Sequence, residues 1–144
     1  MLRFTKRADY GLMAIHYIAV NENLGSVSTK RIADEFRIPP ELLAKILQRL
    51  AKEGLITSQN GPKGGYVLAR RATGITVGEV IRALEGPIRI VDCYEATSEC
   101  PQMERCNLRR PAQKIQAAIS QMLDTMSLSE LTADDMPELL SIRA

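Results

Sequence analysis

The sequence predicts a mainly α-helical fold: a winged helix-turn-helix with a two-stranded β wing and a long C-terminal dimerisation helix. Three observations predict it. Residues 28–53 hold two short helical patterns separated by a turn with two prolines, residues 55–68 hold two apolar segments around a glycine-rich turn, and residues 107–126 carry one long apolar stripe. A chain of 144 residues can bury a core for such a domain without disulfide bonds.

The first predicted helix covers residues 5–20. Its apolar residues recur at spacings of three and four, as on an amphipathic helix, and they are Tyr10, Met13, Ala14, Tyr17 and Ile18. Thr5 can cap the helix by accepting a hydrogen bond from a free backbone N–H. His16, the only histidine, lies at the edge of the stripe. We therefore interpret it as a packed or exposed helix residue rather than a metal ligand.

The next two predicted helices form the helix-turn-helix. The shorter one is capped by Ser28 or Thr29, and its inward-facing residues are Ile32, Ala33 and Phe36. Prolines 39 and 40 end it, but proline suits a first helical turn, so a second helix can run from there to about residue 53. That helix has an apolar face and ends before a glycine that fits a left-handed C-cap; these residues are Leu42, Leu43, Ile46, Leu47, Leu50 and Gly54.

Residues 55–68 predict a β-hairpin. Residues 55–57 and 66–68 form its strands, and the turn between them carries Lys63 among glycines, as a DNA-contacting wing requires. The charge distribution agrees with this interpretation. Residues 1–74 hold 12 Lys and Arg against 6 Asp and Glu, net +6, whereas residues 75–144 hold 7 against 11, net −4. The first half can approach a polyanion, although an ordinary charged surface would also fit these numbers.

Six side chains are the predicted DNA contacts. Lys45 and Gln48 on the second helix match base edges in the major groove, and Glu41 could accept a hydrogen bond from a cytosine amino group. The remaining three, predicted to hold phosphates, are Arg49, Lys30 and Lys63. A small helical core with an ordinary hairpin is the alternative.

The rest of the chain predicts two more helices around an irregular segment. Thr76 and Glu79 form a capping-box pattern for a helix that ends at residues 85–87. The long helix carries a stripe that a second copy of the same helix would cover most simply, comprising Ile115, Ala118, Ile119, Met122, Leu123 and Met126. We divide the chain into a DNA-binding domain, 1–74, a connecting helix with a cysteine loop, 75–106, and a dimerisation helix with a tail, 107–144.

Cys93, Cys100 and Cys106 are the only cysteines. Their odd number, with no signal peptide and no apolar run near the roughly 18 residues of a membrane span, favours a reducing cytoplasm. The spacing C-x6-C-x5-C is wider than zinc knuckles and lacks a fourth cysteine. Three thiolates can hold an iron-sulfur cluster, but three unrelated thiols fit the spacing equally well. No catalytic motif is present, so we predict no enzyme.

Several stretches resemble the winged-helix regulators of the IscR and NsrR type, the Rrf2 superfamily. They are MLRFTKRADYG at residues 1–11, KGGYVL at 63–68, VIRALEGP at 80–87 and the three-cysteine loop. Residues 85–88 and 127–131 look most like the subgroup that regulates the SUF iron-sulfur assembly system. The resemblance covers nearly the whole chain.

The resemblance implies a homodimer in which Cys93, Cys100 and Cys106 of each subunit hold a 2Fe-2S or 4Fe-4S cluster. IscR-like members have a histidine three residues after the last cysteine, but here Arg109 stands there and cannot ligate iron, because it stays protonated. NsrR-like members use an aspartate of the partner subunit's first helix, and Asp9 occupies that place. A first-turn carboxylate favoured by the helix dipole is the alternative for this residue. The first spacer is one residue longer than in the best-known members, so the cluster type stays open.

Together these observations predict a dimeric, cytoplasmic transcription factor, in the simplest case a repressor, whose iron-sulfur cluster sets its affinity for a double-stranded DNA operator. Loss of the cluster to oxygen, nitric oxide or iron shortage would be the signal. A cluster-free regulator of the same fold that senses a metabolite or thiol oxidation is one alternative. A small iron-sulfur redox protein is another, against which the basic wing argues.

Overall fold

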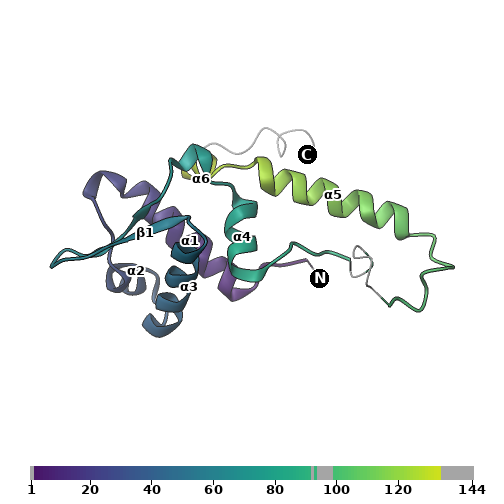
Figure 1. Ribbon diagram of the computed structural model, residues 1–144, viewed down its shortest axis with the longest axis horizontal. Helices are drawn as coiled ribbons and strands as arrows, with labels where there is room; N and C mark the ends of the chain where they lie inside the picture. The colour runs from purple at the N-terminus through teal and green to yellow at the C-terminus, as the bar shows by residue number, and fades with distance from the viewer. Residues whose placement is uncertain (1, 92, 94–98, 134–144) are drawn as a thin grey trace.

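The computed structural model describes residues 2–91, 93 and 99–133. It is mainly helical with a two-stranded antiparallel sheet, as predicted. The winged helix-turn-helix forms a compact unit, and the long helix α5 (Arg109–Thr125) extends away from it (Figure 1). The wing and the loop that carries Cys100 and Cys106 lie at opposite ends of the long axis of the molecule. Within one chain, the helices between them therefore separate the loop from the wing (Figure 1).

Helix α1 (Lys6–Val20) begins where the sequence predicts. The Thr5 hydroxyl accepts a hydrogen bond from the backbone N–H of Ala8 at 3.1 Å. The buried face differs from the predicted stripe, since it consists of Ala8, Gly11, Ala14, Ile15 and Ile18. A Cβ atom at Gly11 would collide with the side chain of Leu84 on α4 (Val77–Glu85). Small residues thus let α1 and α4 approach closely, which a search for large apolar side chains overlooks.

The helix-turn-helix consists of α2 (Thr29–Phe36) and α3 (Pro40–Lys52). Ser28 caps α2, and Arg37, in the left-handed region with φ of 52°, ends it. On α3 the predicted apolar face is confirmed for Leu43, Ile46, Leu47 and Leu50, which are fully buried. It is wrong for Leu42, which is 37% exposed. Consecutive residues on a helix point about 100° apart, so Leu42 lies beyond the edge of the buried face.

The wing pairs β1 (Ile56–Gln59) with β2 (Gly65–Leu68), with Ile56 opposite Leu68. The strands extend slightly further into the turn than predicted. Tyr66 also exchanges two backbone hydrogen bonds with Val27, of 2.8 and 3.0 Å, and the Ser26 hydroxyl donates to the Lys63 carbonyl at 2.6 Å. These contacts fasten the wing to the segment before α2. Two 3₁₀ turns, η1 (Glu22–Leu24) and η2 (Ala72–Gly74), complete the connections.

Helix α4 stands between the winged-helix unit and α5, packing against α1, α3 and α5 (Figure 1). It begins with the predicted capping box: the Thr76 hydroxyl accepts from the Glu79 backbone N–H, and the Glu79 carboxylate accepts from the Thr76 backbone N–H. A second capping box, of Ser127 and Glu130, begins the short helix α6 (Leu128–Thr132). Both boxes show that local sequence signals start these helices.

After α5 the chain returns to the winged-helix unit. Leu128 is 1% exposed and belongs to the same core as α1 and α3. Its backbone N–H donates to the Ile75 carbonyl at 2.7 Å, and the His16 Nε2 lies 3.1 Å from the Leu131 carbonyl oxygen. His16 is thus a packed helix residue, as predicted. The predicted tail contributes to the core up to α6, and its last part, residues 134–144, lies outside the described residues.

Within the described part of the chain, no helix is long and apolar enough to cross a membrane.

Candidate nucleic-acid interface and cysteine loop

The recognition helix α3 presents a polar face opposite its buried one. Glu41, Lys45 and Gln48 are all exposed, and their spacing of four and three residues places them along one side of the helix. Leu43, Ile46, Leu47 and Leu50 fix the other side in the core. The three predicted base contacts therefore share one accessible surface of an α-helix, and an α-helix fits into a major groove.

Lys30 and Lys63 lie on two other elements at the same end of the molecule as α3 (Figure 1). Lys30 lies in the first turn of α2, Lys63 lies at the tip of the wing, and both are exposed. The α2, α3 and wing elements lie at the end of the molecule away from α5 (Figure 1). The hydrogen bond from Ser26 to the Lys63 carbonyl, which sequence reasoning missed, holds the backbone of the wing tip. This arrangement suits one base-reading helix with phosphate contacts on both sides.

Arg49 has internal partners in addition to its predicted phosphate contact. Its Nε donates to the Ala83 carbonyl on α4 at 2.9 Å, and its Nη2 pairs with Glu53 at 3.0 Å. The side chain remains 43% exposed. Glu53 four residues along the helix was visible in the sequence, whereas the contact to α4 spans 34 residues and left no local signal. Arg49 therefore joins the recognition helix to α4.

Cys100 and Cys106 lie in irregular backbone, as predicted, whereas Cys93 has 3₁₀-helical backbone. All three are free thiols and half-buried. Two turn-like hydrogen bonds, from Met103 N–H to the Cys100 carbonyl and from Arg105 N–H to the Gln102 carbonyl, both 3.0 Å, shape the segment between Cys100 and Cys106. Thiols are the donors that iron-sulfur clusters prefer, so the donor set fits such a cluster in kind.

In the described part of the chain, one subunit alone does not bring a complete ligand set together. Among the residues that the structure describes, no three His, Cys, Asp or Glu side chains are grouped as a metal site. Asp9 is exposed in the first turn of α1, and Arg109 is exposed at the start of α5. An aspartate that completes the site of a partner subunit would not meet the cysteines of its own chain.

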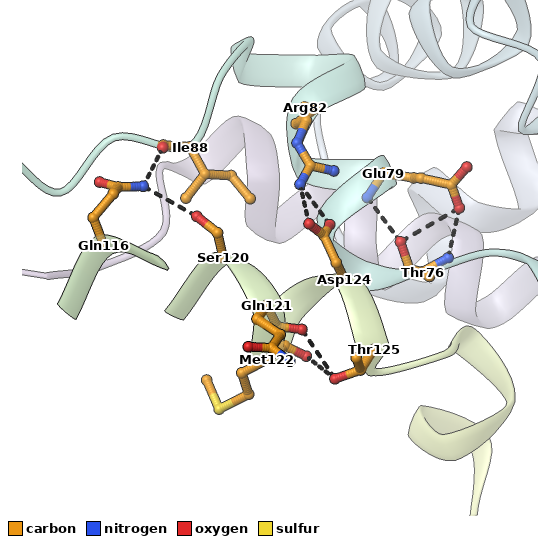
Figure 2. Close-up of polar contacts among 10 residues, drawn as sticks. All are labelled: Thr76, Glu79, Arg82, Ile88, Gln116, Ser120, Gln121, Met122, Asp124 and Thr125. Atoms are coloured by element: carbon orange, nitrogen blue, oxygen red, sulfur yellow. Dashed lines mark hydrogen bonds and ion pairs between the residues drawn. The ribbon is translucent and has the colours of Figure 1, made fainter. Parts of the chain in front are cut away.

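Sequence reasoning missed the residue that holds the entry to the cysteine loop. Gln116 on α5 is 1% exposed, and its carboxamide lies against residues 88–90. The Oε1 accepts from the Ile90 backbone N–H at 2.6 Å. The Nε2 donates to the Ile88 carbonyl at 2.7 Å and to the Ser120 hydroxyl at 3.0 Å (Figure 2). A glutamine in a helix is usually solvated, so nothing local singled it out.

Another polar contact joins α5 to α4 itself. Arg82 forms an ion pair with Asp124 at 2.5 Å (Figure 2). One turn earlier on α4, Glu79 pairs with Arg70 at 2.9 Å. Partial burial acts to raise the pKa of the Glu79 carboxyl, but hydrogen bonds from Thr76 and the charge of Arg70 outweigh it and lower this pKa below its ordinary 4.5.

Helix α5 keeps most of its apolar side chains near or at the surface. Leu108, Ile115 and Met122, spaced by seven residues, are 64, 53 and 43% exposed. Ile119 and Leu123 from the same predicted stripe are half-buried and line a groove of about 500 Å³ with Phe4 and residues 87–90. The predicted stripe thus divides into one side that faces the groove beside α4 and one side that faces solvent.

Comparison with protein families identifies the chain's relatives. The family model Rrf2, described as an iron-dependent transcriptional regulator, matches residues 4–134. The chain is 36% identical over 133 residues to the protein rrf2 of Nitratidesulfovibrio vulgaris, covering 92% of this chain and 89% of that protein. It is 31% identical over 133 residues to the HTH-type transcriptional repressor NsrR of Streptomyces coelicolor, with the same coverages of 92 and 89%.

Solved structures agree with this likeness. The chain is similar to CymR, the global cysteine regulator of B. subtilis, with a TM-score of 0.76, 31% identity, and coverage of 94% of this chain and 100% of that one. An oxidized form of Staphylococcus aureus CymR gives a TM-score of 0.72 at 29% identity, with coverages of 94 and 100%. IscR of T. potens gives 0.73 at 26% identity, with coverages of 97 and 96%.

Proposed function

Because this chain belongs to the Rrf2 family of transcriptional regulators, we propose that it is a homodimeric repressor whose operator affinity is set by an iron-sulfur cluster on Cys93, Cys100 and Cys106. Family membership makes it a DNA-binding regulator rather than an enzyme. The observation that carries the proposal is that three free, half-buried thiols follow one another beyond α4. The segment before α5 that carries two of them lies at the end of the molecule opposite the wing (Figure 1).

The exposed face of α3 supports operator binding. Lys45 and Gln48 would read base edges, and Glu41 would accept from a cytosine amino group. Lys30, Lys63 and the exposed part of Arg49 would contact phosphates. The net charge of +6 in residues 1–74 favours approach to DNA. The role of repressor is supported by the name of the Streptomyces relative.

The solvent-facing side of α5 supports a homodimer. Leu108, Ile115 and Met122 repeat every seven residues and leave apolar surface exposed. A second copy presents the same stripe, so two α5 helices can cover each other around a two-fold axis.

The cluster would be held by the three cysteines, with Asp9 of the partner subunit as the fourth ligand. When bound, it would supply iron that oxygen, nitric oxide or iron shortage can alter or remove. The description of the family as iron-dependent supports this. A reducing cytoplasm, which we propose as the location, would keep the thiols available. As the target we propose genes of the SUF assembly system, and the promoter fragments that the purified protein retains would test that choice.

Helices α5 and α4 offer the route from the loop to the DNA-binding face. Gln116 holds residues 88–90, Asp124 pairs with Arg82 on α4, and Arg49 of α3 donates to Ala83 on α4. A change that moves the loop would bias the placement of α3 through these contacts. Coupling of about 1 to 3 kcal/mol, or roughly 5- to 150-fold in affinity, is typical of such switches.

Metal analysis of anaerobically purified protein tests the proposal. We expect roughly two or four irons per subunit with matching acid-labile sulfide, as expected for one cluster, and a visible absorption band that Cys100→Ala removes. Gln102→Ala, in the same loop, is the matched control and should keep iron and colour. Iron-free, colourless protein that still binds its operator would contradict the cluster proposal and leave the DNA-binding function intact.

A second candidate is a regulator of the same fold that senses thiol oxidation without a cluster. The chain is similar to S. aureus CymR, one structure of which is of an oxidized form. The three cysteines of this chain are free thiols. This candidate predicts that hydrogen peroxide changes the operator affinity of iron-free protein, and that a cysteine substitution abolishes the change. The cluster proposal predicts that iron-free protein has lost its response before oxidant is added.

A further inference from the structure

We propose that Gln116 is a positioning residue that fastens the entry of the cysteine loop to α5 and couples the loop to the recognition helix. This inference rests on the proposed function in one respect, namely that the loop holds the regulatory group. In the described part of the chain, Gln116 is the only buried polar or charged residue. Such a residue is kept in an apolar site only if its polar atoms are satisfied.

The carboxamide of Gln116 pairs with the backbone of residues 88–90 as another peptide group would. It accepts from the Ile90 N–H at 2.6 Å and donates to the Ile88 carbonyl at 2.7 Å, as a neighbouring strand would. The third contact, to the Ser120 hydroxyl one turn along α5, uses the remaining N–H and fixes the orientation of the carboxamide (Figure 2). Two residues separate Ile90 from Cys93. Gln116 thus holds the backbone directly before the first proposed ligand.

The helix that carries Gln116 is itself tied to α4. Asp124, eight residues later on α5, forms the ion pair with Arg82 (Figure 2). A Cβ atom at Gly78 would collide with the Asp124 carboxylate, so α4 and α5 lie in close contact there. Arg82 precedes Ala83, whose carbonyl accepts from Arg49 on the recognition helix. The contacts from residues 88–90 to α3 are therefore continuous and involve closely packed helices.

We call the two hydrogen bonds between Gln116 and residues 88–90 the clamp. Through the clamp, a movement of the loop acts on α5. Ligation of Cys93 that displaces residues 88–91 would have one of two results. Either α5 moves with these residues, or the Ile90 N–H and the Ile88 carbonyl lose their hydrogen-bond partner. The second outcome is unfavourable because an unpaired buried polar group keeps its full desolvation cost. A side chain of the same length without polar atoms would let the loop move independently of α5.

The first test measures the clamp in iron-free, reduced protein, with neither cluster nor DNA. Gln116→Met keeps the side-chain length and removes the hydrogen bonds, and Gln121→Met makes the same change at an exposed position of α5. The measurement is the alkylation rate of each cysteine by iodoacetamide, followed by mass spectrometry. We expect Gln116→Met to raise the Cys93 rate about fivefold or more, the factor expected for losing one such hydrogen bond. The Cys106 rate and the Gln121→Met variant should match the wild type.

Two outcomes of that test would overturn the clamp. One is an unchanged Cys93 rate in Gln116→Met. The other is an equal increase at Cys93 and Cys106, because it would mean that the whole loop or fold has loosened. A thermal unfolding curve of the same variant identifies a general loss of structure, which would show as an increase at both cysteines.

The second test measures the coupling. The operator affinities of cluster-loaded and iron-free protein give a ratio for the wild type, and Gln116→Met should bring that ratio towards one while iron content is kept. A purely structural role would weaken both forms equally and leave the ratio unchanged, which would overturn the coupling. A wild-type ratio of one would overturn the proposed function itself, whereas the alkylation result decides the clamp in either case.

Discussion

The winged-helix unit and helix α5 differ in what they bury. The unit encloses Ile15, Leu43 and Ile46 completely, whereas the one buried residue of α5 in the described chain is the polar Gln116. Ile115 and Met122 on α5 remain exposed. Burial of apolar surface is the main stabilising contribution to a fold, so the first region, together with Leu128, is stabilised within one chain. The second region gains comparable stabilisation only when another surface covers its stripe.

The two regions are also joined in a particular way. Two specific polar contacts attach α5: Asp124 pairs with Arg82 on α4, and Gln116 bonds to residues 88–90, which follow α4. Apolar contacts tolerate small shifts, but hydrogen bonds require defined partners and weaken steeply when geometry changes. We infer that the winged-helix unit, whose apolar side chains are buried, reads DNA. Helix α5, which has exposed apolar side chains and specific polar contacts, would carry the signal.

The largest expected effect is the loss of stability when a buried isoleucine, Ile46, is truncated, compared with an exposed one, Ile115. Ile46→Ala in the core should lower the free energy of unfolding by about 2 to 5 kcal/mol, because it leaves a cavity among fully buried neighbours. Ile115→Ala removes the same atoms from a side chain that is 53% exposed. Urea unfolding at two protein concentrations measures both. The cost of Ile115→Ala should be smaller and should grow with concentration if a second copy covers the residue; equal costs would remove the contrast between the regions.

The next effect concerns the partner of α5. Ile115→Glu places a charge in the centre of the exposed stripe and should weaken the dimer by about 2 kcal/mol or more, as for a central interface residue. Sedimentation equilibrium of wild type and variant measures this, with Lys114→Glu, an exposed neighbour, as control. A dimer that persists unchanged in Ile115→Glu would place the interface elsewhere.

On the DNA-binding face, the effect should depend on the kind of contact. Gln48→Ala should weaken operator binding by about 1 to 3 kcal/mol and leave non-specific binding nearly unchanged, because it removes a base contact. Lys63→Ala should weaken both and reduce the slope of log affinity against log salt by about one unit. Fluorescence anisotropy with operator and scrambled duplexes separates the two. If Gln48→Ala weakened both duplexes equally, the base-reading role would be refuted.

The smallest expected effect tests the capping box at the junction of the two regions. Thr76→Ala should cost about 1 kcal/mol at neutral pH, because it removes the N-cap of α4. The Glu79 pKa is raised by partial burial but lowered overall by hydrogen bonds from Thr76 and the charge of Arg70. A carboxyl whose pKa is lowered by folding stabilises the fold above its ordinary value of 4.5, and this stabilisation is lost as the pH falls through the folded-state pKa.

The difference in unfolding free energy between wild type and Glu79→Gln should therefore shrink as the pH falls below 4.5. Urea unfolding between neutral pH and that range measures it. Glu53→Gln, whose ion pair lies on the surface of α3, serves as control. A difference that does not change with pH would show that the Glu79 charge adds nothing to the junction.

Sequence reasoning predicted the elements whose signals are local. Ser28, the prolines before α3 and the box of Thr76 and Glu79 act within one helical turn, so each element began near the expected residue. The packing of Leu128 into the core that contains Ile15 and Ile18, more than a hundred residues earlier, was not visible, because the residues around Leu128 do not indicate its partner. The same holds for Gln116 and for the contact of Arg49 with Ala83.

The site was predictable in its donor types but not in its geometry. Three thiols and a basic recognition face could be identified from residue type and order. Which face of α5 meets α4, and which faces solvent, depends on where residues 88–90 cross the helix, as Gln116 shows. The fourth ligand depends on a second chain, so one sequence leaves Asp9 as a prediction.

The central claim, that the cysteine loop sets operator affinity from the far end of the molecule, has one direct test. A single anaerobic preparation is divided, one part keeps its iron and the other is stripped by a chelator, and both are titrated onto the same operator at one salt concentration. If the loop sets operator affinity, the two affinities should differ by roughly 5- to 150-fold, and a Cys100→Ala protein should bind like the stripped form. Equal affinities of the iron-loaded and stripped forms would contradict it.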